Sequence, residues 1–347
     1  MTGGALLLLL AAVPVSNRGI SGEPPTLAPT SEISEPPARE KKLTMEETVR
    51  LQVFLDRAEF APGKIDGRYG EFTAKALALY RQAHECEPVS DHPALAECEE
   101  DSGAPSDLSD LDLASVEPVF VLYTVTEADL QTVGILPESL DEQEKQRWLP
   151  YQDAAEAIAE KFHADVDFLA EINPAMRHGL NAGDQLLVPN VIPFDVTAVK
   201  NLKPGEDLEP GEPPAAIRVD TESNMLMVFQ AGELLAAYPV SVGTGRTESP
   251  RGEWRVRGVT RMPSCRYDEA MLTRGERSEN FHMLPPGPNN PLGVLWISLN
   301  RRGVGLHGTD EPEEVGHVAS HGCVRLANWD IVRLARKVCD EVPVLIE

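Results

Sequence analysis

The sequence predicts three modules in series: a small helical bundle, a small α/β unit and a mostly β C-terminal domain. The chain of 347 residues is longer than a single core usually organises. Apolar residues recur at helical spacing between Thr44 and Gln82, whereas apolar and polar residues alternate in several segments after Ala215. A hydrophobic fraction of 42% is enough for ordinary globular cores.

The N-terminus carries a short apolar run from Gly4 to Val13, followed by Pro14 and small residues. Such a run is short for a membrane span and is typical of the core of a signal peptide, although the usual basic residues before it are missing. We expect residues 1–22 to be an export segment, which would contact a membrane only if it is retained. Residues 23–43 are rich in Pro, Ser and Glu, which predicts an extended linker.

Two helices are predicted in residues 44–86. Thr44-Met-Glu-Glu47 reads as a capping box before an apolar stripe, and a second helix is expected over about 71–82. The connecting sequence from Phe60 to Gly70, Phe-x-Pro-Gly-x-Ile-Asp-Gly-x-Tyr-Gly, resembles that of a small three-helix domain attached to wall hydrolases. The resemblance implies a peptidoglycan-binding module.

The next segment is strongly acidic. No lysine or arginine occurs between Arg81 and Lys145, and the net charge of the chain is −25. This charge argues against binding to nucleic acids or anionic lipids. Residues 87–118 are interpreted as a solvated acidic linker, with cation binding as the alternative.

Residues 119–192 combine two predicted strands with two predicted helices. The strands include Tyr123–Val125 and 181–190, and the helices cover about 154–162 and 168–172. This order resembles a LysM module, which implies glycan binding. A LysM module lacks the additional residues from Val133 to Pro150, which lie beside the loop that would contact sugar.

Alternating residues after Ala215 predict half-buried strands of an antiparallel sandwich or barrel. The alternating sets are Ile217 and Val219; Met225, Met227 and Phe229; and Val294, Trp296 and Ser298. A helix is expected from Asn328 to Cys339, with Ile331, Leu334, Ala335 and Val338 on its inner face.

One short segment near the C-terminus contains a thiol and two imidazoles, at His307, His321 and Cys323. A thiol with a pKa of about 8.5 is mostly protonated at neutral pH, so a neighbouring imidazole is needed to activate it. Gly322 permits a sharp turn that would direct its N–H and that of Cys323 toward an oxyanion. We therefore predict a cysteine nucleophile with a depressed pKa.

Three other interpretations compete. Cys323 could be an inert buried thiol or half of a disulfide. His307, His317, His321 and Cys323 could also bind zinc. The glycines in the segment favour a loop over the helix that would align two of these histidines, so neither a metal nor another cofactor is expected.

Several motifs of the C-terminal domain resemble those of the YkuD-type L,D-transpeptidases, enzymes of peptidoglycan assembly. His307-Gly-Thr followed by Ser320-His-Gly-Cys-Val-Arg325 is similar to the family signature. Ser249-Pro-Arg-Gly resembles its Thr-Pro-x-Gly turn, and Asn290-Pro-Leu-Gly resembles its Asn-Pro-Leu-Gly segment. The likeness covers residues 215–347 and departs at 261–268, where relatives often carry a Trp-Pro pair before the substrate lid.

The resemblance implies acyl transfer on peptidoglycan stem peptides, with Cys323 as nucleophile and His307 as general base oriented by the carbonyl of Gly308. It implies supporting roles for four residues: thiolate tuning by His321, an oxyanion N–H from Gly322, and substrate contacts by Ser320 and Arg325. A salt bridge that fixes the loop is an equal alternative for the arginine. All these residues follow Ala215, so a chain beginning near Pro213 is predicted to fold and act alone.

The same motifs leave two alternative functions: an L,D-carboxypeptidase that uses water, and a wall-binding protein with little turnover. Peptidoglycan is the expected partner, nucleic acid is not, and an exported protein of the periplasm or envelope is expected. The other cysteines fit an oxidising compartment. Cys86 and Cys98 would close a short acidic loop, whereas Cys265 and Cys339 are either disulfide candidates or buried free thiols.

Overall fold

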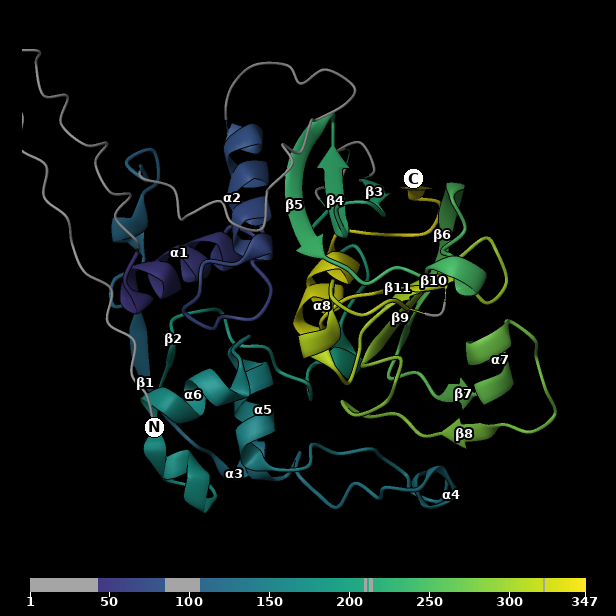
Figure 1. The fold of residues 1–347 in the computed structure, drawn as a ribbon, viewed down its shortest axis with the longest axis horizontal. Helices are drawn as coiled ribbons and strands as arrows, with labels where there is room; N and C mark the ends of the chain where they lie inside the picture. Colours follow the sequence, from purple (N-terminus) through teal and green to yellow (C-terminus); the bar gives the residue numbers. More distant parts are fainter. Residues whose placement is uncertain (1–42, 85–106, 209–210, 212–214, 321) are drawn as a thin grey trace, which may run out of the picture. The chain divides into compact units, whose positions relative to one another are not determined.

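The computed structural model describes residues 43–84, 107–208, 211, 215–320 and 322–347 (Figure 1), all within the compact unit Glu40–Glu347. Outside the described residues lie the predicted export segment, residues 23–42 of the Pro-rich linker, Cys86, Cys98 and His321. In the described part of the chain, no helix combines the length and apolar composition required to cross a membrane.

The helical unit contains α1 (Met45–Arg57) and α2 (Glu71–His84), both as predicted. Thr44 and Glu47 form the expected capping box, in which each side chain accepts a hydrogen bond from the other residue's backbone N–H. These are the α-helices of residues 43–84; a third helix of the expected bundle is not found in that range.

Two apolar side chains of residues 107–118 pack against the helical unit, although most of this segment is exposed. Leu111 and Val116 are buried in a cluster with α1. Arg81 donates two hydrogen bonds to the carboxylate of Asp110, at 2.7 and 2.8 Å. Apolar side chains between the acids, together with this ion pair, hold the segment against the helical unit.

The α/β unit has the predicted strands and helices. Strand β1 (Phe120–Thr124) pairs antiparallel with β2 (Gln185–Pro189), and α5 (Ala154–Lys161) and α6 (Val166–Ile172) lie between them in sequence. Two short helices, α3 (Glu127–Leu130) and α4 (Leu140–Gln143), accompany the inserted segment.

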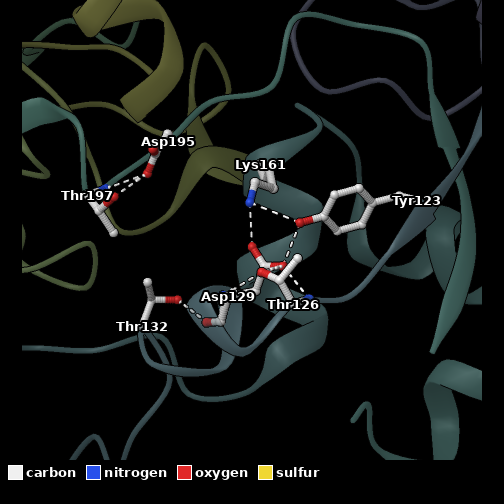
Figure 2. A network of polar contacts seen from close by, with 7 residues as sticks. All are labelled: Tyr123, Thr126, Asp129, Thr132, Lys161, Asp195 and Thr197. Atoms are coloured by element: carbon white, nitrogen blue, oxygen red, sulfur yellow. Dashed lines mark hydrogen bonds and ion pairs between the residues drawn. The ribbon is translucent and has the colours of Figure 1, made fainter. Parts of the chain in front are cut away.

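A buried carboxylate holds this unit together (Figure 2). Asp129 of α3 accepts hydrogen bonds from Tyr123 Oη at 2.5 Å and Thr126 Oγ1 at 2.7 Å, and forms an ion pair with Lys161. Because these partners come from β1, its C-terminal turn and α5, the network fixes the start of the insertion relative to the unit's sheet and first long helix.

The C-terminal part of the chain contains an eight-stranded sheet with the order β11-β10-β9-β6-β12-β3-β4-β5. Its strands are β3 (Ala216–Asp220), β4 (Met225–Gln230), β5 (Glu233–Pro239), β6 (Gly252–Arg261), β9 (Leu295–Leu299), β10 (Gly305–His307), β11 (Val324–Arg325) and β12 (Pro343–Ile346). The expectation of a purely antiparallel sheet is wrong for two pairs. Strands β10 and β11 are parallel, as are β12 and β3, because crossover segments precede β11 and β12.

The sheet curls until its edges meet. Ser241, just after β5, exchanges two backbone hydrogen bonds of 2.9 Å with Arg325 of β11. The Ser320 N–H donates to the carbonyl of Val242 at 2.8 Å. This closure brings the 320–325 segment beside the end of β5.

Helix α8 (Asn328–Arg336) packs its apolar face on the curled sheet, close to the predicted bounds, with Ile331, Leu334 and Ala335 buried. In Figure 1 the helix lies beside β9–β11. It is the longest helix of the described C-terminal residues, which also contain α7 (Glu269–Arg274).

Strand β4 is buried on both faces, which contradicts the half-buried prediction. Leu226 and Val228 belong to the core under α8, whereas Met225 and Met227 pack in the same cluster as Phe60. The helical unit also reaches the outer strand, because the Ala237 backbone exchanges hydrogen bonds of 2.9 and 2.8 Å with Glu59 and Ala61. The upstream module therefore covers a sheet face and protects a sheet edge.

Asp56 of α1 connects all three parts of the chain. Its buried carboxylate accepts hydrogen bonds from Arg333 of α8 at 2.8 and 3.0 Å and lies 2.9 Å from Nδ1 of His163. Burial alone would raise the pKa of Asp56, but Arg333 and His163 hold it well below its usual value. The network is further evidence that the parts share an interior.

The insertion packs against the hairpin formed by β7 (Cys265–Tyr267) and β8 (His282–Leu284). Leu149 is buried with Cys265 and Leu284, and its N–H donates to the carbonyl of Pro286 at 2.8 Å. The insertion therefore supports the hairpin from below in the orientation of Figure 1.

Candidate active site

Cys323 and His307 line one cavity of about 1380 Å³. His307 ends β10, and Cys323 immediately precedes β11, which runs parallel to β10 with Leu306 opposite Val324. Adjacent parallel strands thus bring together two residues that are separated by a long loop. The structure therefore unites the two residues predicted to be nucleophile and base.

The imidazole of His307 has a defined hydrogen-bonding role. Its Nδ1 lies 2.6 Å from the carbonyl oxygen of Gly308, which can only accept, so Nδ1 carries the proton and Nε2 keeps its lone pair. The ring stacks on Trp296 with a centroid distance of 5.5 Å. Burial lowers the pKa of His307 to about 4, so the ring is neutral near pH 7.

The expected depression of the Cys323 pKa is wrong for this structure. Burial raises the pKa of the half-buried thiol to about 11, which a weak hydrogen bond to backbone counters only in part. Sγ lies 3.6 Å from the carbonyl oxygen of Gly303. Because the neighbouring His307 is neutral, it does not provide the positive charge that stabilises a thiolate. At rest the cavity is therefore lined by a neutral thiol at Cys323 and a neutral imidazole at His307.

Alkylation of Cys323 by iodoacetamide is expected to accelerate as pH rises through 9 toward 11, because the reactive thiolate appears only there. The rate should be measured by peptide mapping in a Cys339→Ser background, which removes the cysteine that is exposed among the three described. Cys323→Ser is the blank. A rate that levels off below pH 8 would show that the free enzyme already holds a thiolate.

Glycines shape the loop before the cysteine. Gly322 has a φ of +108°, a conformation that L side chains rarely adopt. A Cβ at Gly243 would lie 2.7 Å from both Cα and N of Gly322, so Gly243 has no room for a side chain. Ser249 supports this contact, because its Oγ accepts the N–H of Gly243 at 2.8 Å.

Ser320 stabilises the same loop. It is buried, and its hydroxyl donates to the carbonyl oxygen of Cys323. The Gly322 N–H reaches Ser320 Oγ only at 3.4 Å, a long contact that leaves this donor weakly engaged. Ser320 lines the cavity, but its hydroxyl is directed at the backbone, which makes it a support for the turn.

Arg325 forms the loop-fixing salt bridge that was one of its two predicted roles. Its Nη1 lies 3.3 Å from Glu314 Oε2, and its Nη2 donates to the carbonyl of Val318 at 3.1 Å. Its Nε is buried and has no hydrogen-bond partner among the described residues. The hydrogen bonds of the guanidinium are therefore directed at Glu314 and Val318, which fix the loop.

The candidate zinc ligands that the structure describes are His307, His317 and Cys323. His317 packs edge-to-face on Phe72 of α2, at a centroid distance of 5.3 Å. Within the described ranges, no group of three or more His, Cys, Asp or Glu residues is placed to hold a metal ion. Cys265 and Cys339 are both free thiols; the former is buried, which raises its pKa to about 12, and the latter is exposed.

Asn328 and Trp296 were not assigned site roles from the sequence. The sequence placed Trp296 in a strand of alternating apolar residues with Val294 and Ser298. In the structure, the buried face of this strand, β9, is formed by Leu295, Ile297 and Leu299. The tryptophan is thus free to stack on His307. Asn328, the first residue of α8, is fully buried, and its Oδ1 accepts the N–H of Val294 at 3.0 Å.

The cavity wall also includes residues from the upstream α/β unit, which the sequence did not indicate. These are Tyr151, Gln152, Asp153, Glu156, Glu160 and Asp165. The only available sequence signal was the insertion itself, because an unusual loop is often functional. The candidate site is therefore built by more than the C-terminal domain.

Comparisons with known proteins match the C-terminal part of the chain, which contains Cys323 and His307. The family model that matches, YkuD, describes an L,D-transpeptidase catalytic domain and covers residues 214–346. YkuD of Bacillus licheniformis, named as an L,D-transpeptidase, is 27% identical over 184 residues, 53% of this chain and 87% of that protein. YqjB of Bacillus subtilis, also named as one, is 32% identical over 149 residues, 41% of this chain and 75% of that protein.

A solved L,D-transpeptidase structure from Mycobacterium smegmatis aligns with a TM-score of 0.33 and 19% identity, over 40% of this chain and 59% of that one. The sequence matches place residues 214–346 among L,D-transpeptidase catalytic domains, a class of acyltransferases. The chain belongs to the YkuD family of these enzymes.

Proposed function

We propose that this protein transfers acyl groups between peptidoglycan stem peptides through a Cys323 thioester. The observation that supports the proposal most directly is the free Nε2 of a neutral, oriented His307 in the cavity that also holds Cys323. Family membership supports the substrate class, because the matched domain is that of L,D-transpeptidases.

In the first half-reaction, His307 Nε2 takes the thiol proton as Sγ attacks the carbonyl carbon of the third stem residue, an L-centre. The N–H groups of Gly322 and Cys323 stabilise the resulting oxyanion, and the loss of one such donor typically costs about 3 to 4 kcal/mol. The C–N bond then breaks, and D-alanine leaves with the proton from His307. The product is a thioester on Cys323.

In the second half-reaction, an amine of a neighbouring stem attacks the thioester carbonyl. His307 accepts a proton from this amine, the C–S bond breaks, and the proton returns to the departing sulfur. The new amide is a cross-link between two stems. His321, which lies outside the described residues, is proposed to tune the sulfur, and Arg325, which lines the cavity, to bind a stem carboxylate.

The upstream units are proposed to bind the wall. Residues 44–86 would act as a peptidoglycan-binding helical module and residues 119–192 as a LysM-like module. Their presence would raise the local concentration of stems near Cys323. With residues 1–22 as an export segment, the protein would work in the periplasm or cell envelope.

The choice of acceptor is tested with the purified full chain and a tetrapeptide stem, with and without an amine-bearing stem. We expect D-alanine release and a linked product when the amine is present, and slower tripeptide formation without it. Mass spectrometry measures both products, with Cys323→Ala as the control. Tripeptide alone at saturating amine would identify a carboxypeptidase. Sacculus binding without release of D-alanine would indicate a wall-binding protein.

A further inference from the structure

A carboxylate from the upstream α/β unit reaches the first residue of α8. Glu160 of α5 is only 7% exposed. Its Oε1 accepts a hydrogen bond from Nδ2 of Asn328 at 2.8 Å, and its Oε2 accepts one from the hydroxyl of Tyr151. This contact joins two segments that are far apart in the sequence, one of which lies outside residues 215–347.

The hydrogen bonds of Asn328 determine the orientation of its amide. Oδ1 accepts the N–H of Val294 at 3.0 Å, so Nδ2 must face Glu160. The other acceptor near Nδ2 is the carbonyl of Pro288, at the longer distance of 3.5 Å. Without the carboxylate, a fully buried donor would keep only this weak partner.

The amide of Asn328 packs directly on the backbone beside the catalytic histidine. A Cβ at Gly293 or at Gly308 would lie 2.1 Å from its Oδ1, which shows how closely the side chain contacts both glycines. The carbonyl of Gly308 is the group that holds Nδ1 of His307. A displacement of Asn328 would therefore shift the peptide that orients the imidazole.

We propose that Glu160 is a positioning residue for His307: its carboxylate holds the Asn328 amide against Gly293 and Gly308, which fixes the carbonyl that orients the imidazole. This inference rests on the proposed role of His307 as general base. It assigns to the upstream α/β unit a part in the chemistry, in addition to wall binding.

The chemistry of Glu160 indicates which variants are informative. Burial raises the pKa of this carboxyl to about 7, opposed by the hydrogen bonds from Tyr151 and Asn328. The ionised carboxylate, the neutral acid and a glutamine amide all present an oxygen to Asn328 Nδ2. Glu160→Gln should therefore keep the contact, Glu160→Asp should withdraw the acceptor by one methylene, and Glu160→Ala should remove it.

The test uses the full chain and measures kcat and KM on the tetrapeptide stem. Since a misplacement of about 1 Å can cost about 10²-fold, we expect Glu160→Ala to lower kcat by about 10- to 100-fold with little change in KM. Glu160→Asp should give a smaller loss, and Glu160→Gln should stay within about threefold of wild type. Glu59→Gln is the matched control, because Glu59 is another upstream carboxylate that contacts the C-terminal domain, through Tyr238 and Lys337 at 2.9 Å.

A second readout does not depend on turnover. In selectively ¹⁵N-labelled protein, the His307 ring should show a single tautomer protonated at Nδ1 in wild type and Glu160→Gln, and a mixture in Glu160→Ala. If Glu160→Ala does not fold, Glu160→Asp decides. A folded variant that lacks the contact, with wild-type kcat and an unchanged His307 spectrum, would overturn the inference. If the proposed function is wrong, the wild-type protein will not turn over the tetrapeptide stem. The comparison of His307 tautomers between wild type and the Glu160 variants still tests positioning in that case.

Discussion

Replacement of Cys323 with alanine or serine is expected to abolish turnover while the protein remains folded. The substitution removes the sulfur that we assign as nucleophile in the cavity that His307 also lines, and it changes little volume in a half-buried position. D-alanine release from a tetrapeptide stem is the measurement, together with a thermal melt. Activity within about tenfold of wild type would exclude Cys323 as nucleophile, since covalent catalysis cannot proceed without it.

His307→Ala is the companion variant. General-base assistance typically contributes about 10² to 10⁴ in rate, so we expect a loss in that range. The comparison with His321→Ala assigns the two histidines: a much larger loss for His321→Ala would mean that their roles are reversed. Both variants should melt close to wild type if they affect chemistry alone.

The features that the sequence predicted are those set by local spacing. The Thr44–Glu47 capping box, α2, β1 with β2, and α8 all follow from patterns within a short window. The cysteine–histidine pair was predictable for a different reason, since a family signature carries it. Such local patterns say little about what covers each surface.

The features that were missed depend on contacts between distant segments. Strand β4 alternates in sequence like a half-exposed strand, yet Met225 and Met227 are buried by the helical unit. The stacking of Trp296 on His307 depends on which face of β9 the tryptophan occupies and on where the neighbouring strand places the histidine. Glu160 is recognised as part of the site only when its distance to Asn328 is known.

The pKa of the Cys323 thiol was also not predictable from local sequence. Sequence proximity of cysteine and histidine predicted a stabilised thiolate, but the sign of the shift depends on burial and on the protonation state of the imidazole. Both groups are desolvated, which raises the pKa of Cys323 and lowers that of His307. We therefore place proton transfer in the substrate complex rather than in the free enzyme.

A chain shortened to residues 213–347 is expected not to fold stably, the reverse of the sequence prediction. The truncation would expose Met225 and Met227, whose burial is worth about 1.5–3 kcal/mol each. It would also leave Arg333 without Asp56 and the edge of β5 without its backbone partners. A domain is stabilised by only about 5–15 kcal/mol in total, so these losses are decisive. Circular dichroism melts and D-alanine release are the measurements.

A chain of residues 43–347 is the control, because it keeps every contact described above. A cooperative melt of the shortened chain near the control temperature, with full kcat, would contradict the prediction and would make the upstream units independent modules. Serine substitutions at Met225 and Met227 separate the two effects of truncation. If the serine substitutions restore a folded fragment, they do so because they make the newly exposed sheet face polar. In that case we expect the kcat of the fragment to remain low, because the fragment still lacks Glu160, the hydrogen-bond partner of Asn328.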